Sequence, residues 1–364
     1  MKIKEIIDEL EKIAPLTLQE NYDNAGLLIG NANEECKGVL ITLDVTENVL
    51  EEAITKKANL IVSHHPLIFG GLKKITGKTE TERITLKAIK NDVAIYAIHT
   101  NLDNVATGVN ATICKKIGLT RLRTLVPGEK QLRKLVTYCP VDFADKVRMA
   151  LFEAGAGHIG NYDSCSFNSA GTGTFKAGEG THPFVGKLNE LHHESEIRIE
   201  TIFPFFLESK IIQALIAAHP YEEVAYDIYQ VENNNPQTGA GMYGLLEPAL
   251  SRDAFLLLLK ERFRTGCIRY SDFGDKPIRT VAVCGGAGSF LISAAIRTGA
   301  DAFITGDIKY HDFFIPEGRM LLADIGHYES EQYTKELLFN QITKIFPTFA
   351  VQISEHNTNS VHYF

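Results

Sequence analysis

The sequence predicts an α/β protein in which both ends of the chain form one α/β domain and a ferredoxin-like α+β domain is inserted between them. Three observations predict this fold. Strands and helices alternate along residues 1–130 and again along 233–364, and a strand–helix–strand–strand–helix–strand order fills residues 131–232. The alternation is typical of a parallel sheet covered on both faces, whereas the second order is that of a split βαβ fold.

The first segment predicts an amphipathic helix. Apolar residues recur at helical spacing from Ile3 to Ile13, and Pro15 ends the pattern. Short apolar runs then alternate with helical periodicity. They predict strands at 39–45, 59–62 and 93–98, and helices at 46–57, 80–90 and 108–117.

The remaining elements follow the same criteria. Within the insert we expect strands at 134–139, 163–168, 173–177, 197–203 and 224–230, and helices at 142–154 and 206–217. Residues 233–239 are rich in Asn, Pro and Gly, which predicts a linker. Beyond it we expect helices at 253–262, 290–298 and 329–338, and strands at 280–284, 302–305 and 320–323. The glycine-rich loop 285–289 suits either an anion held by backbone amides or a tight strand-to-helix turn.

Composition and charge exclude several classes of protein. The 364 residues include 37 basic and 45 acidic side chains, a formal net charge of −8, which disfavours a sequence-independent grip on nucleic acid or an anionic membrane. No apolar run approaches the roughly 20 residues that span a bilayer. Acidic residues interrupt the N-terminal segment where a signal peptide needs an apolar core, and the six cysteines form no Cys-x-x-Cys pair. We therefore expect a cytoplasmic protein with reduced thiols.

His64 and His65 are the first candidate site residues. Adjacent side chains of a regular strand point to opposite faces, so two neighbouring imidazoles converge only where the strand has ended. Pro66 provides that end because it has no backbone N–H to donate. The pair suits two ligands of one metal ion, or one ligand for each of two ions. Taken alone, two polar loop residues are the simpler interpretation.

Asp103, His327 and Glu331 add to this pair. Asp103 follows a predicted buried strand, although an Asp in a turn often bonds only nearby backbone amides. His327 and Glu331 are four residues apart at a predicted helix start, which places them on one face, although a Glu there is often only a partner of the helix dipole. Together these features offer three imidazoles and two carboxylates at what the topology predicts to be one edge of the sheet.

Five nitrogen and oxygen ligands favour a dinuclear metal site. A catalytic zinc usually takes three protein ligands, whereas five suit two divalent ions about 3.5–4 Å apart. Zinc is the first expectation, with manganese, iron or nickel as alternatives. Asp44, His99, Asp307 and His311 are candidates for the surroundings of these ligands. Their alternatives are structural: helix caps for the two Asp residues, a satisfied buried imidazole for His99 and a surface imidazole for His311.

Several segments resemble the signature sequences of the NIF-three-like family, whose members are also named GTP cyclohydrolase 1 type 2 homologues. The resemblance runs in the same order over nearly the whole chain. It rests on the segments Ser-His-His-Pro at 63–66, His-Thr-Asn-Leu-Asp at 99–103, Gly-His-Tyr-Glu-Ser-Glu at 326–331, and on residues 21–28, 285–289 and 304–311.

The resemblance implies a ligand set and an assembly. It implies two metal ions held by residues that are all present here: His64, His65, Asp103, His327 and Glu331. It also implies a toroidal homohexamer whose metal sites face an internal cavity. Residues 131–232 would be a domain similar to the PII and CutA-type ferredoxin-like folds, including the segments 171–175 and 219–223. Relatives often carry Trp where this chain has Tyr22, so an aromatic ring is kept there.

Two classes of function remain open at this stage. The first is a metal-dependent hydrolase, for which the family name points to opening of the GTP purine ring by attack at C8 and loss of formate. A nucleotide phosphoester is an equally reasonable target for two metal ions. The second is a non-catalytic metal-binding scaffold or regulatory protein whose inserted domain senses a ligand or partner. The sequence identifies no general base that would separate them.

Overall fold

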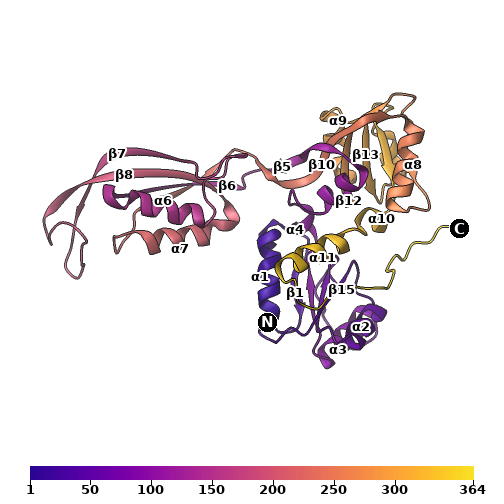
Figure 1. The fold of residues 1–364 in the computed structure, drawn as a ribbon, viewed down its shortest axis with the longest axis horizontal. Helices are drawn as coiled ribbons and strands as arrows, with labels where there is room; N and C mark the ends of the chain where they lie inside the picture. Colours follow the sequence, from indigo (N-terminus) through magenta and orange to yellow (C-terminus); the bar gives the residue numbers. More distant parts are fainter. The chain divides into compact units, whose positions relative to one another are not determined.

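The computed structural model describes residues 1–364, which divide into two compact units. One unit combines residues 1–127 with 236–364, so that both ends of the chain build it, and the other contains residues 128–235. The fold is mixed α/β with three sheets (Figure 1). None of its helices has the length and apolar character that a membrane-spanning segment needs.

The first sheet of the larger unit has five strands in the order β1-β4-β3-β2-β15. They are β1 (Gly26–Ile29), β2 (Val39–Thr42), β3 (Leu60–Ser63), β4 (Ala94–Ala97) and β15 (Val351–Ile353). β15, β2, β3 and β4 are parallel, and β1 is antiparallel to β4. The end of the chain therefore returns to this sheet, where helix α11 (Thr334–Ile345) packs on β15 and β2 (Figure 1).

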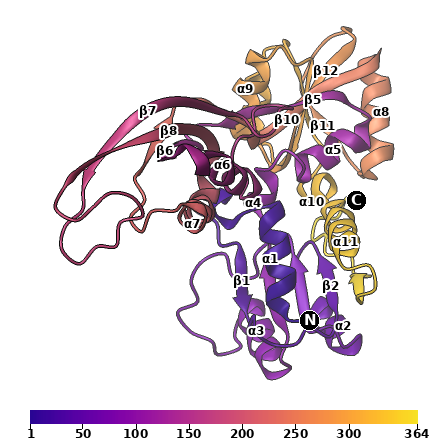
Figure 2. The same cartoon turned by 60° about the vertical axis from the view of Figure 1, so that its left-hand side comes forward.

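Helices cover both faces of this sheet. β2, β3 and β4 are buried at every position, as a parallel sheet between two helical layers requires. Helices α2 (Glu47–Thr55) and α3 (Glu80–Lys90) pack on one face, and each begins at a threonine whose side chain accepts a backbone N–H. Helix α1 (Ile3–Ile13) lies over the other face (Figure 2). Its Glu11 side chain is close to the hydroxyl of Tyr96 in β4.

The second sheet of the larger unit has six strands in the order β11-β14-β13-β12-β10-β5. They are β5 (Thr120–Gly128), β10 (Asn235–Leu250), β11 (Arg269–Tyr270), β12 (Ile278–Ala287), β13 (Ala302–Gly306) and β14 (Leu321–Asp324). β12, β13 and β14 are parallel, while β10 and β11 pair antiparallel with β12 and β14. Helix α9 (Ile292–Arg297) packs on one face, and α5 (Val109–Ile117), α8 (Arg252–Phe263) and α10 (His327–Glu331) lie on the other.

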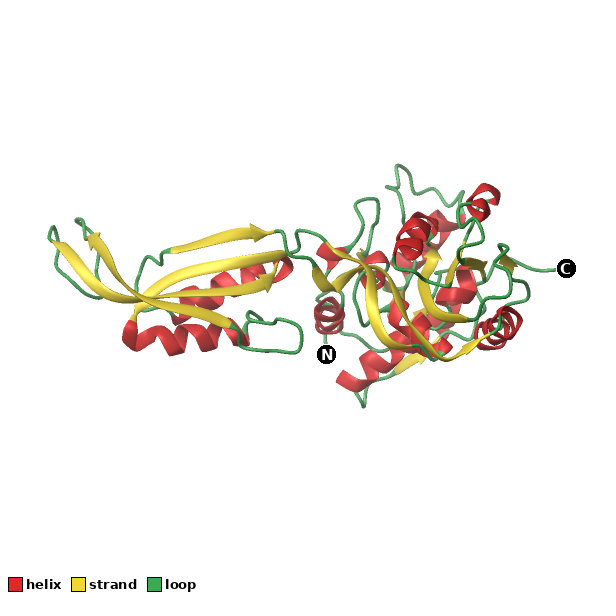
Figure 3. Ribbon diagram, turned by 90° about the horizontal axis from the view of Figure 1, so that it is seen from above, coloured by secondary structure: helices red, strands yellow, loops and turns green.

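The unit of residues 128–235 is a four-stranded antiparallel sheet with two helices. Its strands β6 (Leu132–Pro140), β7 (Ser166–Lys176), β8 (Leu191–Pro204) and β9 (Tyr226–Val231) lie in the order β7-β8-β6-β9. Helices α6 (Ala144–Glu153) and α7 (Glu208–Ala218) cover the same face of the sheet (Figure 3). Leu135, Ile199, Leu151 and Leu215 belong to the core between them. The other face of the sheet carries no helix.

Several elements differ from the sequence prediction. The strands expected at 163–168 and 173–177 are one strand, β7, because β8 pairs with it without interruption from Ser166 to Lys176. The helix expected at 329–338 is two helices, and the break coincides with hydrogen bonds from Gln332 and Tyr333 to backbone carbonyls at the end of α8. The linker expected at 233–239 contains the start of β10, where the Thr124 hydroxyl donates to the Pro236 carbonyl.

The expected single parallel sheet is instead two mixed sheets. Five strands have no counterpart in the prediction from the sequence: β1, β5, β10, β11 and β15. β11 and β15 are only two and three residues long. β1 begins at Gly26 with φ +114°, and β10 contains Gly and two Pro residues. Neither a short strand nor a Gly- and Pro-containing one has a periodicity that its sequence reveals.

Candidate metal centre

In the first sheet, polar residues follow the carboxyl ends of three parallel strands. Asp44 follows β2, and His64 and His65 follow β3 directly. After β4 the chain turns at His99 into a single helical turn, α4 (Thr100–Asp103), which ends in Asp103. Because parallel strands end at the same edge, these side chains lie in neighbouring loops.

In the second sheet, Asp307 follows β13, and α10, which begins at His327 and ends at Glu331, follows β14. Gly326, with φ +96°, makes the turn between β14 and α10. Gly306 allows the end of β13 to approach the start of α10 closely, because a Cβ at this position would lie 2.8 Å from the backbone nitrogen of His327. The candidate site therefore lies between the ends of two sheets, and not at one edge of a single sheet as expected.

The structure brings the five predicted residues together around Glu331. The Nε2 atom of His64 lies 3.7 Å from Glu331 Oε1 and 3.7 Å from Asp103 Oδ1. The other Glu331 oxygen, Oε2, lies 3.0 Å from His65 Nε2 and 3.1 Å from His327 Nε2. These two imidazole nitrogens are 3.3 Å apart. Six atoms thus form two sets of three, and the group of His64, His65 and Glu331 could hold a metal ion.

Partners outside this cluster orient each of its imidazoles. Each ring makes a hydrogen bond at Nδ1 with an oxygen that acts as acceptor: His64 with the Ile98 carbonyl at 2.8 Å, His65 with Asp44 Oδ1 at 2.7 Å, and His327 with Asp307 Oδ2 at 2.7 Å. Because these oxygens accept, Nδ1 carries the proton in all three rings. The Nε2 atoms that face the cluster are then free to bind a metal ion when the rings are neutral.

His99 lies beside the cluster, and its partner is a residue that sequence reasoning missed. Its ring stands edge-on to those of His64 and His65, with centroids 5.4 and 5.5 Å away. Nδ1 of His99 is 2.7 Å from Asp23 Oδ1, and Asp23 also accepts from the backbone N–H of Thr100. Asp23 precedes β1 in a polar loop with no periodicity, so only the resemblance of the segment 21–28 marked it.

His311 is not brought to the cluster. It lies in a short 3-10 helix, Tyr310–Phe314, where its ring packs against Tyr310 and Phe314 with centroids 5.2 and 6.4 Å away. Its side chain is exposed. Asp307, four residues earlier, does contact the cluster, because its carboxylate accepts the Nδ1–H of His327.

The two carboxyl groups of the cluster have opposite pKa shifts. Burial raises the pKa of Asp103 to about 7, although the nearby His64 acts in the other direction. Burial also acts to raise the pKa of Glu331, but the hydrogen bond from His327 and the neighbouring imidazoles of His64 and His65 outweigh it and hold this pKa well below its usual value. Glu331 is therefore the carboxylate that stays ionised.

The pKa values of two of the imidazoles are raised, which favours their protonated, charged form. Burial opposes a charge on His65, but its hydrogen bonds to Asp44 and Glu331 raise the pKa to about 10. The same competition raises the pKa of His327 to about 9, through Glu331 and Asp307. In the protein without metal these rings are protonated at neutral pH, so a cation that binds here has to displace their protons.

The glycine-rich loop 285–289 supports Glu331, and most of its backbone amides have partners within the protein. The backbone N–H groups of Gly285, Gly286 and Gly288 donate to side chains of Asn110, Ser330 and Thr305. Residues 285–287 continue strand β12. Three of the five backbone amides are thus occupied by side chains of the protein, which favours the structural turn over an anion site.

A prediction follows from the conformation of Gly286. It has φ +60°, and an added Cβ would overlap Glu331 Oε1. We expect Gly286→Ala to lower the free energy of unfolding by roughly 2–4 kcal/mol, the sum of left-handed strain and overpacking. Urea unfolding measures this. Gly299→Ala is the matched control, since Gly299 has φ +74° with nothing within 4 Å of the added Cβ. Equal losses in both variants would contradict close packing against Glu331.

A cavity of about 380 Å³ adjoins the cluster. Its lining includes His65, Asp103, His327 and Glu331 on one side, together with His99. Three exposed aromatic rings line it as well: Tyr22, Phe69 and Phe290, with 63%, 53% and 68% of their surface accessible. A cavity of this size that combines aromatic walls with a few convergent polar groups is typical of a small-molecule site.

Comparison with known proteins is consistent over the whole chain. The family Duf34/NIF3 (NGG1p interacting factor 3) matches residues 1–360. A Bacillus subtilis protein named "GTP cyclohydrolase 1 type 2 homolog" is 40% identical over 365 residues, covering 98% of this chain and 97% of that protein. A Staphylococcus epidermidis protein of the same name is 34% identical over the full length of both.

Solved structures agree with the sequence comparison. A Bacillus cereus protein described as related to NIF3 superposes with a TM-score of 0.88 at 38% identity, covering 100% of this chain and 99% of that one. The Staphylococcus aureus protein SA1388 superposes with a TM-score of 0.78 at 30% identity and the same coverage. The chain therefore belongs to the Duf34/NIF3 family.

Proposed function

We propose that the five clustered residues hold two divalent metal ions, and that the protein is a metal-dependent hydrolase acting on a nucleotide or a related small molecule. The observation that carries this proposal is the division of donor atoms around Glu331. One Glu331 oxygen faces His64, beside Asp103, and the other faces His65 and His327. Each half then offers three nitrogen or oxygen donors, the usual number in a catalytic zinc site, with Glu331 as the bridge.

Two buried polar atoms are better explained as ligands of a bound cation than as partners in a hydrogen bond. His64 Nε2 and Asp103 Oδ1 are both buried without a hydrogen-bond partner, and they lie 3.7 Å apart. This separation is too long for a hydrogen bond between them. Two ligand atoms about 2.1 Å from one tetrahedral ion are about 3.4 Å apart, so the spacing is close to that of two ligands of one cation. An unpaired polar atom is costly to bury, and a cation removes that cost.

The donor set indicates which cations fit. Imidazole nitrogens with carboxylates, and no thiolate, suit zinc first and manganese, iron or nickel as alternatives. When bound, two such ions lower the pKa of a water molecule and stabilise negative charge on the attacked carbon or phosphorus centre. Asp23 holds the Nδ1–H of His99, which leaves the Nε2 of that ring as an acceptor on the cavity wall. We assign His99 the role of orienting a water molecule or a substrate N–H or O–H group.

The aromatic lining supports a substrate with a planar ring. Tyr22, Phe69 and Phe290 present exposed ring surface close to the cluster, and a nucleobase can stack on such rings. The curated relatives carry the name GTP cyclohydrolase 1 type 2 homolog, which makes GTP the first nucleotide to test. Loss of formate from the purine ring and hydrolysis of a phosphoester are the two reactions to compare.

The proposal includes an assembly and a location. We infer that residues 128–235 are a ferredoxin-like domain, because their element order and the sheet order β7-β8-β6-β9 are those of a split βαβ fold. We infer a homohexamer of the 40.3 kDa chain, which the family resemblance implies. We infer a cytoplasmic location from the six unpaired cysteines. Light scattering on the samples used for metal analysis measures the assembly's mass.

Metal content is the first test. We expect elemental analysis of the purified protein to find two equivalents of divalent metal per chain. His64→Ala should lose metal because it removes a buried donor of one half of the cluster. His158→Ala is the matched control, since this imidazole is exposed in the other unit. Metal-free wild type after purification and after soaking with zinc or manganese would reject the metal site.

Turnover is tested on the same samples. Zinc- or manganese-loaded protein is incubated with a panel of nucleotides that begins with GTP, and released formate and phosphate are measured. We expect saturable release of one product, abolished by chelation and by His64→Ala. Two metal equivalents without any release would leave the metal site standing and reject the hydrolase, in favour of a metal-binding scaffold.

A further inference from the structure

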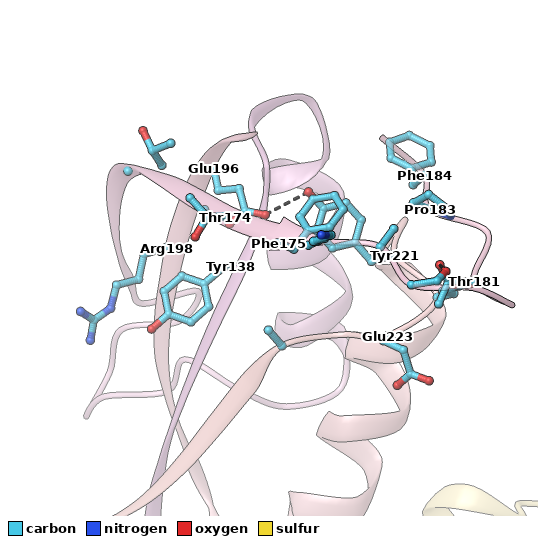
Figure 4. Close-up of a pocket in the computed structure, with 18 of the residues that line it drawn as sticks. Tyr138, Thr174, Phe175, Thr181, Pro183, Phe184, Glu196, Arg198, Tyr221 and Glu223 are labelled. Atoms are coloured by element: carbon cyan, nitrogen blue, oxygen red, sulfur yellow. Dashed lines mark hydrogen bonds between the residues drawn. The ribbon is translucent and has the colours of Figure 1, made fainter. Parts of the chain in front are cut away.

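A second cavity, of about 720 Å³, lies within the unit of residues 128–235. It is on the sheet face that the helices leave open. Leu135, Cys139 and Ile199 point into the core with α6 and α7. Tyr138 and Arg198, which pair directly and adjoin those positions in their strands, therefore point to the opposite face, and both line the cavity. Figure 4 shows the side chains that surround it.

The cavity contains a carboxylate that is largely removed from water. Only 9% of the surface of Glu196 is accessible. Its Oε1 atom accepts a hydrogen bond of 2.9 Å from the Tyr221 hydroxyl (Figure 4). Burial and the nearby Glu196 raise the pKa of Tyr221, which keeps this hydroxyl a donor. A single neutral donor offsets only part of the free energy that it costs to bury a carboxylate. A cationic partner, or one with several N–H groups, stabilises the carboxylate more.

Two glycines in β7 form the floor beside Glu196. Glycine in a strand interior weakens the strand and often marks a close approach of another group. At Gly173 an added Cβ would overlap the Glu196 carboxylate, so this glycine makes room for the acid. Gly171 pairs directly with Glu196 across the two strands, yet a Cβ at Gly171 would meet nothing within 4 Å. The space above Gly171 is therefore open and lies next to the carboxylate.

Aromatic rings form a wall of the cavity. Phe175 and Phe184 lie 6.1 and 6.3 Å from the Tyr221 ring, centroid to centroid. All three line the cavity (Figure 4). More than half of the Phe184 surface is exposed. Aromatic faces carry a negative quadrupole, so they attract a cation or the edge of an electron-poor ring.

The charges around the cavity disfavour an anion. Glu222 and Glu223 join Glu196 in its lining. Arg198 also lines it, and its guanidinium is 2.9 Å from Glu200, a carboxylate that also pairs with Lys134. Lys176 is the other cation of the lining, so three carboxylates stand against two cations and the lining as a whole is negative.

We propose that this cavity binds a small planar nitrogen compound, cationic or rich in N–H donors, such as an amidine or an amino-substituted heteroaromatic ring. The ring lies against the aromatic wall of Phe175, Phe184 and Tyr221, and its nitrogen-bearing end points to Glu196 and the open space beside Gly171. Its N–H groups donate to Glu196. This site is separate from the metal cluster, since all of its lining residues belong to residues 128–235.

Benzamidine and benzoate are the probes that test this proposal, because they have the same shape and opposite charge. Titrations of the zinc-loaded full chain are followed by saturation-transfer NMR. We expect benzamidine to bind and benzoate not to bind. Glu196→Gln should weaken benzamidine binding at least roughly tenfold, which corresponds to the loss of a hydrogen bond to a charged group. Glu190→Gln, an exposed acid of the neighbouring loop, is the matched control and should bind as wild type does.

Gly171→Val is the second variant, in case Glu196→Gln unfolds the domain. An added Cβ meets nothing within 4 Å and valine favours strands, so the strand is expected to fold, while the larger side chain fills the space beside the Glu196 carboxylate. We expect loss of benzamidine binding with an unchanged melting temperature. Benzoate binding as tightly as benzamidine, or benzamidine binding that Glu196→Gln and Gly171→Val leave unchanged, would overturn the proposal. The proposal would also fail if benzamidine did not bind. If Gly171→Val then lowered the mass of the assembly, the open face of the sheet would be an interface between copies of the chain.

Discussion

Replacing Glu331 by Gln is expected to remove both metal ions and to abolish turnover. Each Glu331 oxygen faces a different half of the cluster, so one substitution affects both halves. The amide keeps the shape but places an NH₂ group against imidazole nitrogens or a cation. Changes behind metal ligands cost roughly 10–100-fold in metal affinity, and we expect the loss of a bridging carboxylate to exceed this range. Elemental analysis and product release measure the two effects.

Glu329→Gln is the matched control for this variant. Glu329 lies two residues earlier in α10 and is also buried, but it accepts a hydrogen bond from Asn359 and does not face the cluster. We expect this variant to keep two metal equivalents and its activity. A Glu331→Gln protein that retains one equivalent would show that the two halves are independent and that Glu331 does not bridge them.

Metal binding is expected to release protons and to strengthen steeply with pH. In the metal-free protein the pKa of His65 is raised to about 10 and that of His327 to about 9, so both rings are protonated at pH 7. A metal ion needs the neutral Nε2 atoms, so we expect at least one proton to be released per chain. Calorimetric zinc titrations at pH 7, in buffers with different heats of ionisation, measure this number. A binding heat that is the same in all buffers would contradict the prediction.

Asp307→Asn provides the comparison for proton release. The Asp307 carboxylate accepts the Nδ1–H of His327 and contributes to the raised pKa of that ring. Asparagine can still accept this hydrogen bond but carries no charge. We expect the variant to release fewer protons when zinc binds, while Asp312→Asn, in the short 3-10 helix that follows, releases as many as wild type.

The same two groups set the pH dependence of stability without metal. A raised pKa means that protonation stabilises the folded state: the contribution is complete below the unfolded value near 6.5 and is lost as the pH rises through about 10 for His65. We expect the free energy of unfolding of metal-free protein to fall between pH 7 and 10 by on the order of 3 kcal/mol. The metal-loaded protein should lack this loss because its rings are already neutral. Thermal unfolding of both forms measures the difference.

Residue type and position relative to strand ends were enough to predict which side chains come together. His64, His65 and Asp103 follow strands β3 and β4, and those strands are neighbours and parallel. Parallel strands place their carboxyl ends side by side, so the periodicity of buried strands predicts this part of the cluster. The spacing of His327 and Glu331 predicts that they share a helix face. That these residues bind metal remains a prediction.

Local periodicity could not predict the features that depend on pairing between distant segments. β7 continues through a stretch of low strand propensity because β8 pairs along its whole length. β10 and β15, which the sequence did not reveal, pair with strands 28 or more residues away in the chain. For the same reason Asp23, which precedes β1, was missed: its importance comes from His99, 76 residues later.

By itself, the sequence determined the mixed α/β class, the positions of the buried parallel strands and the set of imidazoles and carboxylates that follow them, because these depend on hydrophobic periodicity and on residue type. Only the tertiary structure decided that the carboxyl ends of the two sheets meet, that Glu331 divides its oxygens between two sets of donors, and that outer partners turn each Nε2 towards the cluster. It also decided that Glu196 is buried beside open space above Gly171. These features depend on distances between side chains from remote segments, which close packing sets and no local pattern encodes.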